Sequence, residues 1–315
     1  MSTDLSQFWR QASLLFHARP LIKCVVTLLL LSLFTALPAT ANTNPERREQ
    51  SNHNGEIAKQ PLNETPILPA SAKTVFDVRR KEICSERSLQ SAICLPVEHI
   101  VADNRRLANF SGLFWVLGTL GLRGTEEVYI IGDSEKRKHF IAGWLYISGQ
   151  QRIHIVTADM ATVLKHVKKS GEKIGKPTHP STTRLTVFSQ APRTNKILTN
   201  SEVLVLLKNK ESTTTVLDGR SEAEYWGRRI RAVRGGHLPG AVWLANPNAP
   251  PGFTANDIVA YAHDAIDGLA LLSQLTLSDI DARLYLGGWA DWAHRGYLPA
   301  DAESFPVTNQ QRPIQ

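Results

Sequence analysis

The stretch IVAYAHDAIDGLALLSQL, residues 258–275, has the pattern of a buried strand, a short polar loop and an apolar helix. Similar units lie on both sides of it in the sequence. Further strands are expected at VYIIG (128–132), RIHIV (152–156), TTVLD (214–218) and ARLYL (282–286), with helices expected between them, among them KRKHFIAGWLYISG (136–149). Strands that alternate with helices of this length predict an α/β fold, with a parallel sheet covered on both faces.

The second half of the chain repeats the order of elements of the first half. TVFDVRR (74–80) aligns with TVLDGRS (215–221), EEVYIIG (126–132) with NDIVAYA (256–262), and RIHIV (152–156) with ARLYL (282–286). The match is one of order and spacing more than of residue identity. It indicates an internal duplication.

Three segments of the second half resemble the tandem rhodanese family, the thiosulfate sulfurtransferases. They are VLDGRSEAEYWG (216–227), RGGHLPGAVWL (234–244) and LYLGGWADW (284–292); the first half keeps FDVRR (76–80) but has QSAICLP (90–96) in place of the second motif. The resemblance implies two rhodanese-like domains, each a parallel sheet flanked by helices. The glycines and prolines of these motifs also suit turns, so they identify a scaffold and do not establish an activity.

The composition of the first residues predicts export. The apolar run CVVTLLLLSLFTAL (24–37) follows basic residues and precedes Ala39-Thr40-Ala41, the pattern of a cleaved secretory signal. We therefore expect the following organisation along the chain: a signal peptide at 1–41, a flexible linker at 42–72, a degenerate rhodanese-like domain at 73–157, an interdomain connection at 158–200, a second rhodanese-like domain at 201–300 and a C-terminal tail at 301–315.

The expected location is the periplasm or the exterior of the cell, with contact to a membrane only if the N-terminal segment stays uncleaved. The formal net charge is +7, which could attract anions. The basic residues are scattered without interleaved aromatics, however, so nucleic acid is not an expected partner. An unknown protein or a small anion remains as the expected partner.

The resemblance also implies a site at the loop after the strand at 257–262. Rhodaneses carry there a loop of the form C-x-x-G-x-R, whose cysteine becomes a persulfide. Here Ala262 stands at the position of that cysteine and Asp267 at the position of the arginine. A methyl group cannot attack sulfur, so no catalytic residue is expected, and the acidic loop should disfavour an anionic donor such as thiosulfate.

The candidate cleft loop therefore comprises His263, Asp264 and Asp267. Both aspartates have a simpler interpretation: Asp264 stands where a helix N-cap belongs, and Asp267 lies in the first turn near free amides and the positive end of the helix dipole. No metal site and no cofactor is predicted, because the loop offers three ligand types without a further partner.

The equivalent loop of the first half also lacks cysteine. Ser134, Lys136 and Arg137 could bind a small anion at a helix start, or could simply belong to a solvated helix face. Cys84 and Cys94 remain after removal of Cys24 with the signal peptide. In an oxidising compartment such a pair favours a disulfide, with two separate buried thiols as the alternative.

These observations favour a non-enzymatic function, that of an exported pseudoenzyme that acts as a binding or scaffolding module. One alternative is a divergent sulfurtransferase that forms a persulfide on Cys84 or Cys94. Another is a small-anion binding protein. The sequence does not identify the partner.

Overall fold

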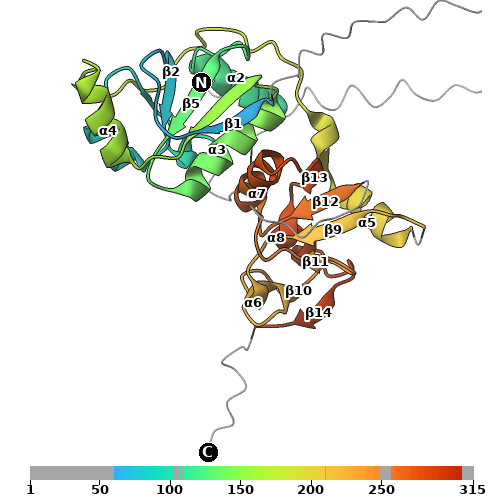
Figure 1. Ribbon diagram of the computed structural model, residues 1–315. Helices are drawn as coiled ribbons and strands as arrows, with labels where there is room; N and C mark the ends of the chain where they lie inside the picture. The colour runs from blue at the N-terminus through green and yellow to red at the C-terminus, as the bar shows by residue number, and fades with distance from the viewer. Residues whose placement is uncertain (1–59, 102–106, 108, 210, 248–256, 307–315) are drawn as a thin grey trace, which may run out of the picture. The chain divides into compact units, whose positions relative to one another are not determined.

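The computed structural model describes residues 60–101, 107, 109–209, 211–247 and 257–306 (Figure 1). The expected signal peptide and the first part of the expected linker lie outside these residues. Within the described ranges, no helix has the length and hydropathy needed to cross a bilayer.

The first half of the chain forms a five-stranded parallel sheet in the order β1-β6-β5-β2-β4. Its strands are β1 (Leu62–Thr65), β2 (Thr74–Asp77), β4 (Ile93–Cys94), β5 (Glu127–Ile131) and β6 (Arg152–Val156).

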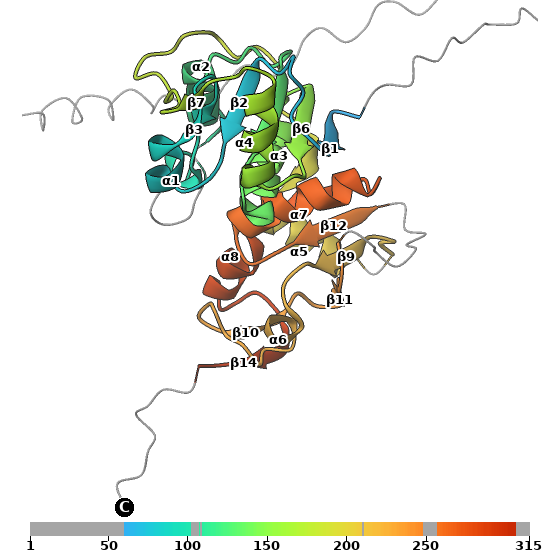
Figure 2. The ribbon, with the colours of Figure 1, turned by 60° about the vertical axis from the view of Figure 1, so that its left-hand side comes forward.

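Side chains alternate between the two faces of this first sheet, as the period of a strand requires. Val128 and Ile130 belong to the core beneath α2 (Phe110–Thr119) and α3 (Glu135–Ser148). Tyr129 and Ile131 pack on the other face against α4 (Met160–Lys169). Both faces are thus covered by helices, as Figures 1 and 2 show.

The second half forms another five-stranded parallel sheet, in the order β11-β9-β12-β13-β8. Its strands are β8 (Ile197–Leu198), β9 (Thr215–Asp218), β11 (Val242–Trp243), β12 (Ile258–Tyr261) and β13 (Ala282–Tyr285). Read from the opposite edge, this order corresponds strand for strand to that of the first sheet. The prediction of an α/β fold with two parallel sheets is confirmed.

The helices of the second half again cover both faces of their sheet. Leu271 and Leu275 of α7 (Ala265–Leu277) pack on one face, with Leu217 and Ala260 of the sheet. Residues of α5 (Asn200–Lys208) and α8 (Gly288–His294) pack on the other face. A single turn of helix, α6 (Glu222–Tyr225), follows β9.

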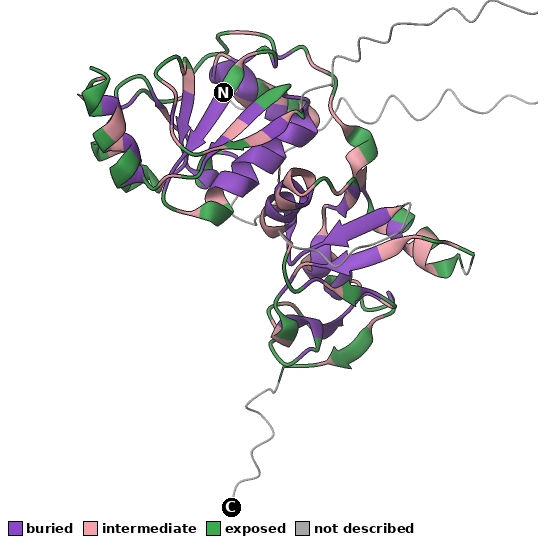
Figure 3. Ribbon diagram, in the orientation of Figure 1, coloured by how far each residue is buried: buried purple, intermediate pink, exposed green. Residues whose placement is uncertain are grey.

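Helix α7 also packs against α3, which joins the cores of the two halves. Leu269, Ala270 and Leu272 of α7 belong to the same hydrophobic cluster as the apolar residues of α3. Every residue of α3 from Lys138 to Ser148 is buried (Figure 3). The lack of a polar face in its sequence follows from this position between a sheet and a second helix.

Short elements complete the two halves. In the first half these are α1 (Lys81–Glu86), β3 (Ser88–Leu89), the 3₁₀ helix η1 (Val97–His99) and β7 (Ile174–Gly175). A second 3₁₀ helix, η2 (Thr194–Lys196), precedes β8, and β10 (Gly235–His237) pairs with β14 (Asp301–Ser304).

The structure differs from the expected boundaries at three places. Residues 62–65, expected within the linker, form the edge strand β1, and Leu62 is fully buried. Residues 158–200, expected as a connection, contain α4 of the first half and β8 of the second sheet. Residues 301–304, expected in the tail, form β14. The short strands β1, β8 and β14 are held by pairing with neighbouring strands and lack a strong local pattern.

Candidate functional site

The loop after β12 lies at the carboxyl edge of the second sheet, where open α/β sheets bind ligands. Ala262 is 2% exposed. Its carbonyl oxygen accepts a hydrogen bond from the Trp289 amide at 2.9 Å, and the His263 carbonyl accepts one from the Ala290 amide at 2.8 Å. The start of α8 thus fixes the backbone of the loop from Ala262 to His263.

Asp264 caps α7. Its Oδ1 accepts hydrogen bonds from the amides of Ile266 at 3.0 Å and Asp267 at 3.1 Å. The simpler interpretation of this aspartate is therefore confirmed. Two amide donors at the helix start are satisfied by a carboxylate of the same chain.

Asp267 lies in the first turn of α7 and is engaged in ion pairs. Its Oδ1 is 2.6 Å from Nζ of Lys136 at the start of α3, and its Oδ2 is 3.7 Å from a guanidinium nitrogen of Arg231. Two cations thus offset the charge of Asp267, and the prediction that the acidic loop disfavours an anionic donor does not follow from this carboxylate alone. The sequence could not show the two cations, which come from distant segments.

His263 faces a buried carboxylate that sequence reasoning missed. Its Nδ1 is 3.8 Å from Oε1 of Glu224, which also pairs with Arg231 at 3.1 Å. Burial, followed by the charge of Arg231, lowers the pKa of His263 below its usual value. The ion pair with Arg231 and the hydrogen bond from Ser221 keep the pKa of Glu224 low against the opposing effect of burial. Two features of the sequence could have pointed to Glu224 and Arg231. Glu224 stands beside Tyr225 in the first motif, and Arg231 belongs to the basic segment GRRIRAVR (227–234).

A buried ion pair between Asp218 and Arg220 lies next to the loop and contacts Tyr261, the residue before it. Both carboxylate oxygens of Asp218, the last residue of β9, accept side-chain hydrogen bonds from Arg220, and the Tyr261 hydroxyl donates to the same carboxylate at 2.5 Å. The Arg220 guanidinium also donates to the Gly236 carbonyl at 2.7 Å. Burial and the Asp218 charge raise the pKa of Tyr261 well above its usual value, so the hydroxyl stays protonated.

The first half contains an equivalent Asp–Arg ion pair, between Asp77 and Arg79. Arg79 binds both oxygens of Asp77 and donates to the Arg87 carbonyl at 2.6 Å. Asp77 pairs with Cys94 across the sheet in the register in which Asp218 pairs with Trp243. The altered segment 90–96 therefore occupies the place of the second motif of the second half.

A cavity of about 680 Å³ opens beside the loop, at the carboxyl ends of β8 and β13. Its polar lining includes Thr199, Asn200, His263, Tyr285, Asp291 and Arg295. Within it, Asp291 accepts a hydrogen bond from the Tyr285 hydroxyl at 2.8 Å and pairs with Arg295 at 3.3 Å. Burial and Asp291 raise the pKa of Tyr285. We call this space the second-domain cavity.

The three residues proposed as an anion site in the first half all contact other residues of the chain. The Ser134 hydroxyl caps α3 by accepting from the Arg137 amide at 3.4 Å. Lys136 pairs with Asp267, and Arg137 pairs with Glu98 at 3.2 Å. Each residue thus has a partner within the chain, while Nη1 of Arg137 is buried without a hydrogen-bond partner among the described residues, and the small-anion site at this loop stays a prediction.

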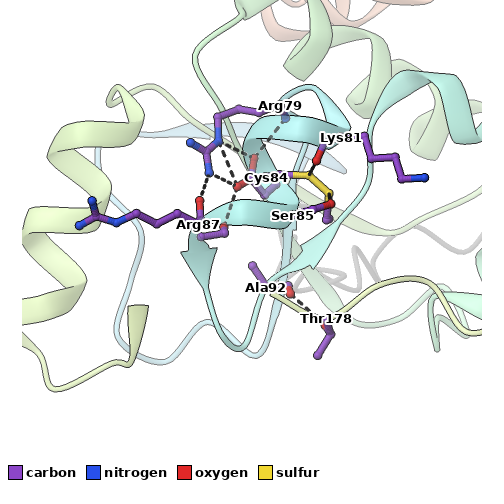
Figure 4. The surroundings of a disulfide bond; sticks show 10 residues. Arg79, Lys81, Cys84, Ser85, Arg87, Ala92 and Thr178 are labelled. Carbon is purple, nitrogen blue, oxygen red and sulfur yellow. Dashed lines mark hydrogen bonds and ion pairs between the residues drawn. A yellow bond between two sulfur atoms is a disulfide. The ribbon is translucent and has the colours of Figure 1, made fainter. Parts of the chain in front are cut away.

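Cys84 and Cys94 are joined by a disulfide bond, with their Cα atoms 5.7 Å apart (Figure 4). Both residues are fully buried, one on α1 and the other on β4. Neither lies on the loop after β5 or β12. In the part of the chain that the structure describes, no group of three or more histidine, cysteine, aspartate or glutamate side chains is arranged to hold a metal ion.

Comparisons with known proteins agree with this architecture. No protein-family model matches the sequence. A thiosulfate sulfurtransferase of Azotobacter vinelandii is 23% identical over 213 residues, which cover 59% of this chain and 73% of the relative.

Solved structures give the same result for the fold. The crystal structure of a probable thiosulfate sulfurtransferase matches with a TM-score of 0.52 and 22% identity, covering 74% of this chain and 99% of the other. The wild-type structure of EanB matches with a TM-score of 0.55 and 16% identity, over 77% of this chain and 66% of EanB. The chain thus spans just under two thirds of EanB. With its duplicated parallel sheets and these neighbours, the chain has the fold of two rhodanese-like domains.

Proposed function

We propose that this chain is an exported rhodanese-like protein that lacks sulfurtransferase activity and acts as a binding or scaffolding module. The observation that carries the proposal is the position of Asp264. Its carboxylate accepts from the amides of Ile266 and Asp267, at the helix start where a rhodanese would stabilise its persulfide.

A persulfide at this place would need free amide donors and a positive potential to keep the sulfur ionised. Asp264 supplies a negative charge to those amides instead, and Ala262 stands at the nucleophile position by the alignment of the motifs. The nearby cations Lys136 and Arg231 are paired with Asp267. The loop is thus stabilised from within the chain, without a bound anion.

The second-domain cavity supports a binding role. Its volume of about 680 Å³ lies within the range of small-molecule sites, roughly 300–1,000 Å³. Hydroxyl, amide and imidazole groups line it together with apolar side chains. Such a cavity suits a small polar ligand or a side chain of a protein partner.

The alternative is a divergent sulfurtransferase, and the Azotobacter relative is the observation in its favour. The nucleophile would have to be Cys84 or Cys94. A reactive cysteine needs an exposed thiolate in an electropositive setting, whereas these two are buried and joined to each other. We therefore rank this alternative second.

The deciding experiment is an assay of thiocyanate formation from thiosulfate and cyanide, run on the mature protein with and without dithiothreitol. We expect no turnover under either condition. Turnover that appears with the reductant and disappears in Cys84→Ser or Cys94→Ser would establish the sulfurtransferase instead.

Export has a separate test. Mass spectrometry of the protein recovered from the periplasmic fraction should give an N-terminus at Asn42. A chain recovered only with its first residues intact would contradict cleavage after Ala41.

A further inference from the structure

Two adjoining cavities lie at the carboxyl edge of the first sheet, away from the loop after β12. One, of about 560 Å³, is lined by residues that include Lys81, Leu95, His99, Trp115 and His179. The other, of about 510 Å³, is lined by residues that include Arg80, Lys81, Glu98, His99 and Arg137. Lys81 and His99 line both, so we treat the pair as one space and call it the first-domain cavity.

The first-domain cavity has an excess of positive charge. Arg80, Lys81 and Arg137 face two carboxylates, Glu82 and Glu98, and Glu98 is already paired with Arg137. Among the residues that the structure describes, Arg80 and Lys81 form no ion pair. Two cations at its wall are thus available to an anion.

The pKa of His99 responds to the charges around this cavity. Burial lowers the pKa of His99 most, and the charge of Lys81 lowers it further. His179 has the same effect as Lys81, while Glu98 acts in the opposite direction. Lys81, His99 and His179 all line the cavity of about 560 Å³.

The rest of the lining is apolar or carries hydroxyl groups. Leu95, Trp115 and Val116 supply the apolar surface, and Thr119 and Thr182 supply hydroxyls. Trp115 is half exposed, and the Arg184 guanidinium lies over its ring, 5.5 Å from the ring centroid. The cavity thus combines a cationic end with an apolar wall.

The disulfide bond ties two walls of this space together. Cys84 lies on α1, which begins at Lys81, and Cys94 lies on β4, which leads into η1 and His99 (Figure 4). A covalent link between these elements reduces the ordering that the cationic groups must undergo when a ligand binds.

We propose that the first-domain cavity binds an organic anion, a carboxylate or sulfonate with a small apolar body. The charged head lies between Lys81, His99 and His179. The body lies against Leu95 and Trp115. This site is in the other domain from the second-domain cavity and does not depend on its function.

Benzenesulfonate is a suitable probe. Inorganic sulfate, which lacks the apolar ring, and benzyl alcohol, which lacks the negative charge, are the matched control compounds. In titration calorimetry of the mature protein, benzenesulfonate should bind more tightly than either. Lys81→Gln should weaken binding about tenfold, the loss of one charge-assisted contact. Lys165→Gln, an exposed lysine of α4, is the matched control and should bind as the wild type does.

A second readout is independent of variant stability. The NMR resonances of the His99 ring should shift on addition of benzenesulfonate, and the pKa of His99 should rise, because a nearby anion favours the imidazolium. Absence of binding, equal affinity for sulfate, or unchanged affinity in Lys81→Gln would each overturn the proposal.

Discussion

Lys136 and Asp267 join the starts of α3 and α7, with Nζ and Oδ1 2.6 Å apart. By the alignment of the duplicated halves, these residues lie in corresponding first turns of corresponding helices. The pair therefore marks the place where the two equivalent loops of the duplicated fold meet.

The Lys136–Asp267 pair should contribute little to stability. The side chain of Lys136 is 58% exposed, so water screens the pair, and a coupling of about 0.5 kcal/mol is expected. The measurement is a double-mutant cycle with Lys136→Gln and Asp267→Asn by urea unfolding, at low and high salt. A coupling above about 2 kcal/mol that salt leaves unchanged would indicate a desolvated pair and contradict this view.

Restoring a thiol at the loop should not restore reactivity. In Ala262→Cys the new thiol would be almost fully buried, beside helix amides that already bond the carboxylate of Asp264, and both conditions disfavour a thiolate. We expect alkylation by iodoacetamide to show a pH midpoint at or above about 8.5, and no thiocyanate formation.

The matched variant adds Asp264→Gly and Asp267→Arg to Ala262→Cys. Removal of the carboxylate frees the amides of Ile266 and Asp267, so the midpoint should fall. If the single variant Ala262→Cys already reacted with a midpoint near 7, the electrostatic argument for an inactive loop would be wrong.

Gly143 is required by the contact between α3 and α7. A Cβ atom at this position would overlap the backbone carbonyl of Leu269. Alanine normally stabilises a helix interior by about 1 kcal/mol relative to glycine, but here the overlap should reverse the sign. We expect Gly143→Ala to lower the free energy of unfolding by about 1–3 kcal/mol.

The control for Gly143→Ala is Gly296→Ala, where an added Cβ meets no heavy atom within 4 Å. Its effect should stay within about 0.5 kcal/mol. Stabilisation by Gly143→Ala in thermal unfolding would show that the two helices are not in the close contact described.

The stability of the fold should decrease as the pH falls from 7.5 to about 5.5. Burial lowers the pKa of His139, whose Nδ1 lies 3.0 Å from the Ser273 hydroxyl, and burial also lowers those of His154 and His263. The unfolded chain then binds more protons than the native one below the ordinary histidine pKa of about 6.5. The contribution of these histidines to stability is therefore complete above about pH 6.5. It is lost as the pH falls toward their lower pKa values in the native state.

Urea unfolding at a series of pH values tests this dependence, with His139→Gln as the diagnostic variant. The substitution should reduce the dependence of the free energy of unfolding on pH between pH 7.5 and 5.5. Below about pH 4.5, where carboxylates titrate, that dependence should stay the same. An unchanged slope in His139→Gln would mean that this histidine titrates normally in the native state.

Much of the fold could be predicted from local sequence. Two parallel sheets could be predicted from the strand periodicity, the alternation with helices and the three motifs of the second half. The N-cap of α7 could be predicted from the position of Asp264. These features depend on neighbouring residues only. β1 was missed because LNET buries one side chain, and only its pairing with β6 makes it a strand.

The sequence by itself determined which chemical groups stand at the loop after β12: a methyl group, an imidazole and two carboxylates. Tertiary structure decided what those groups do. Asp267 meets Lys136 and Arg231 only because α7 packs on α3 and because the segment after α6 returns to the same edge. Pairing between charges far apart in the chain depends on distances that folding creates, and no local pattern of residues records them.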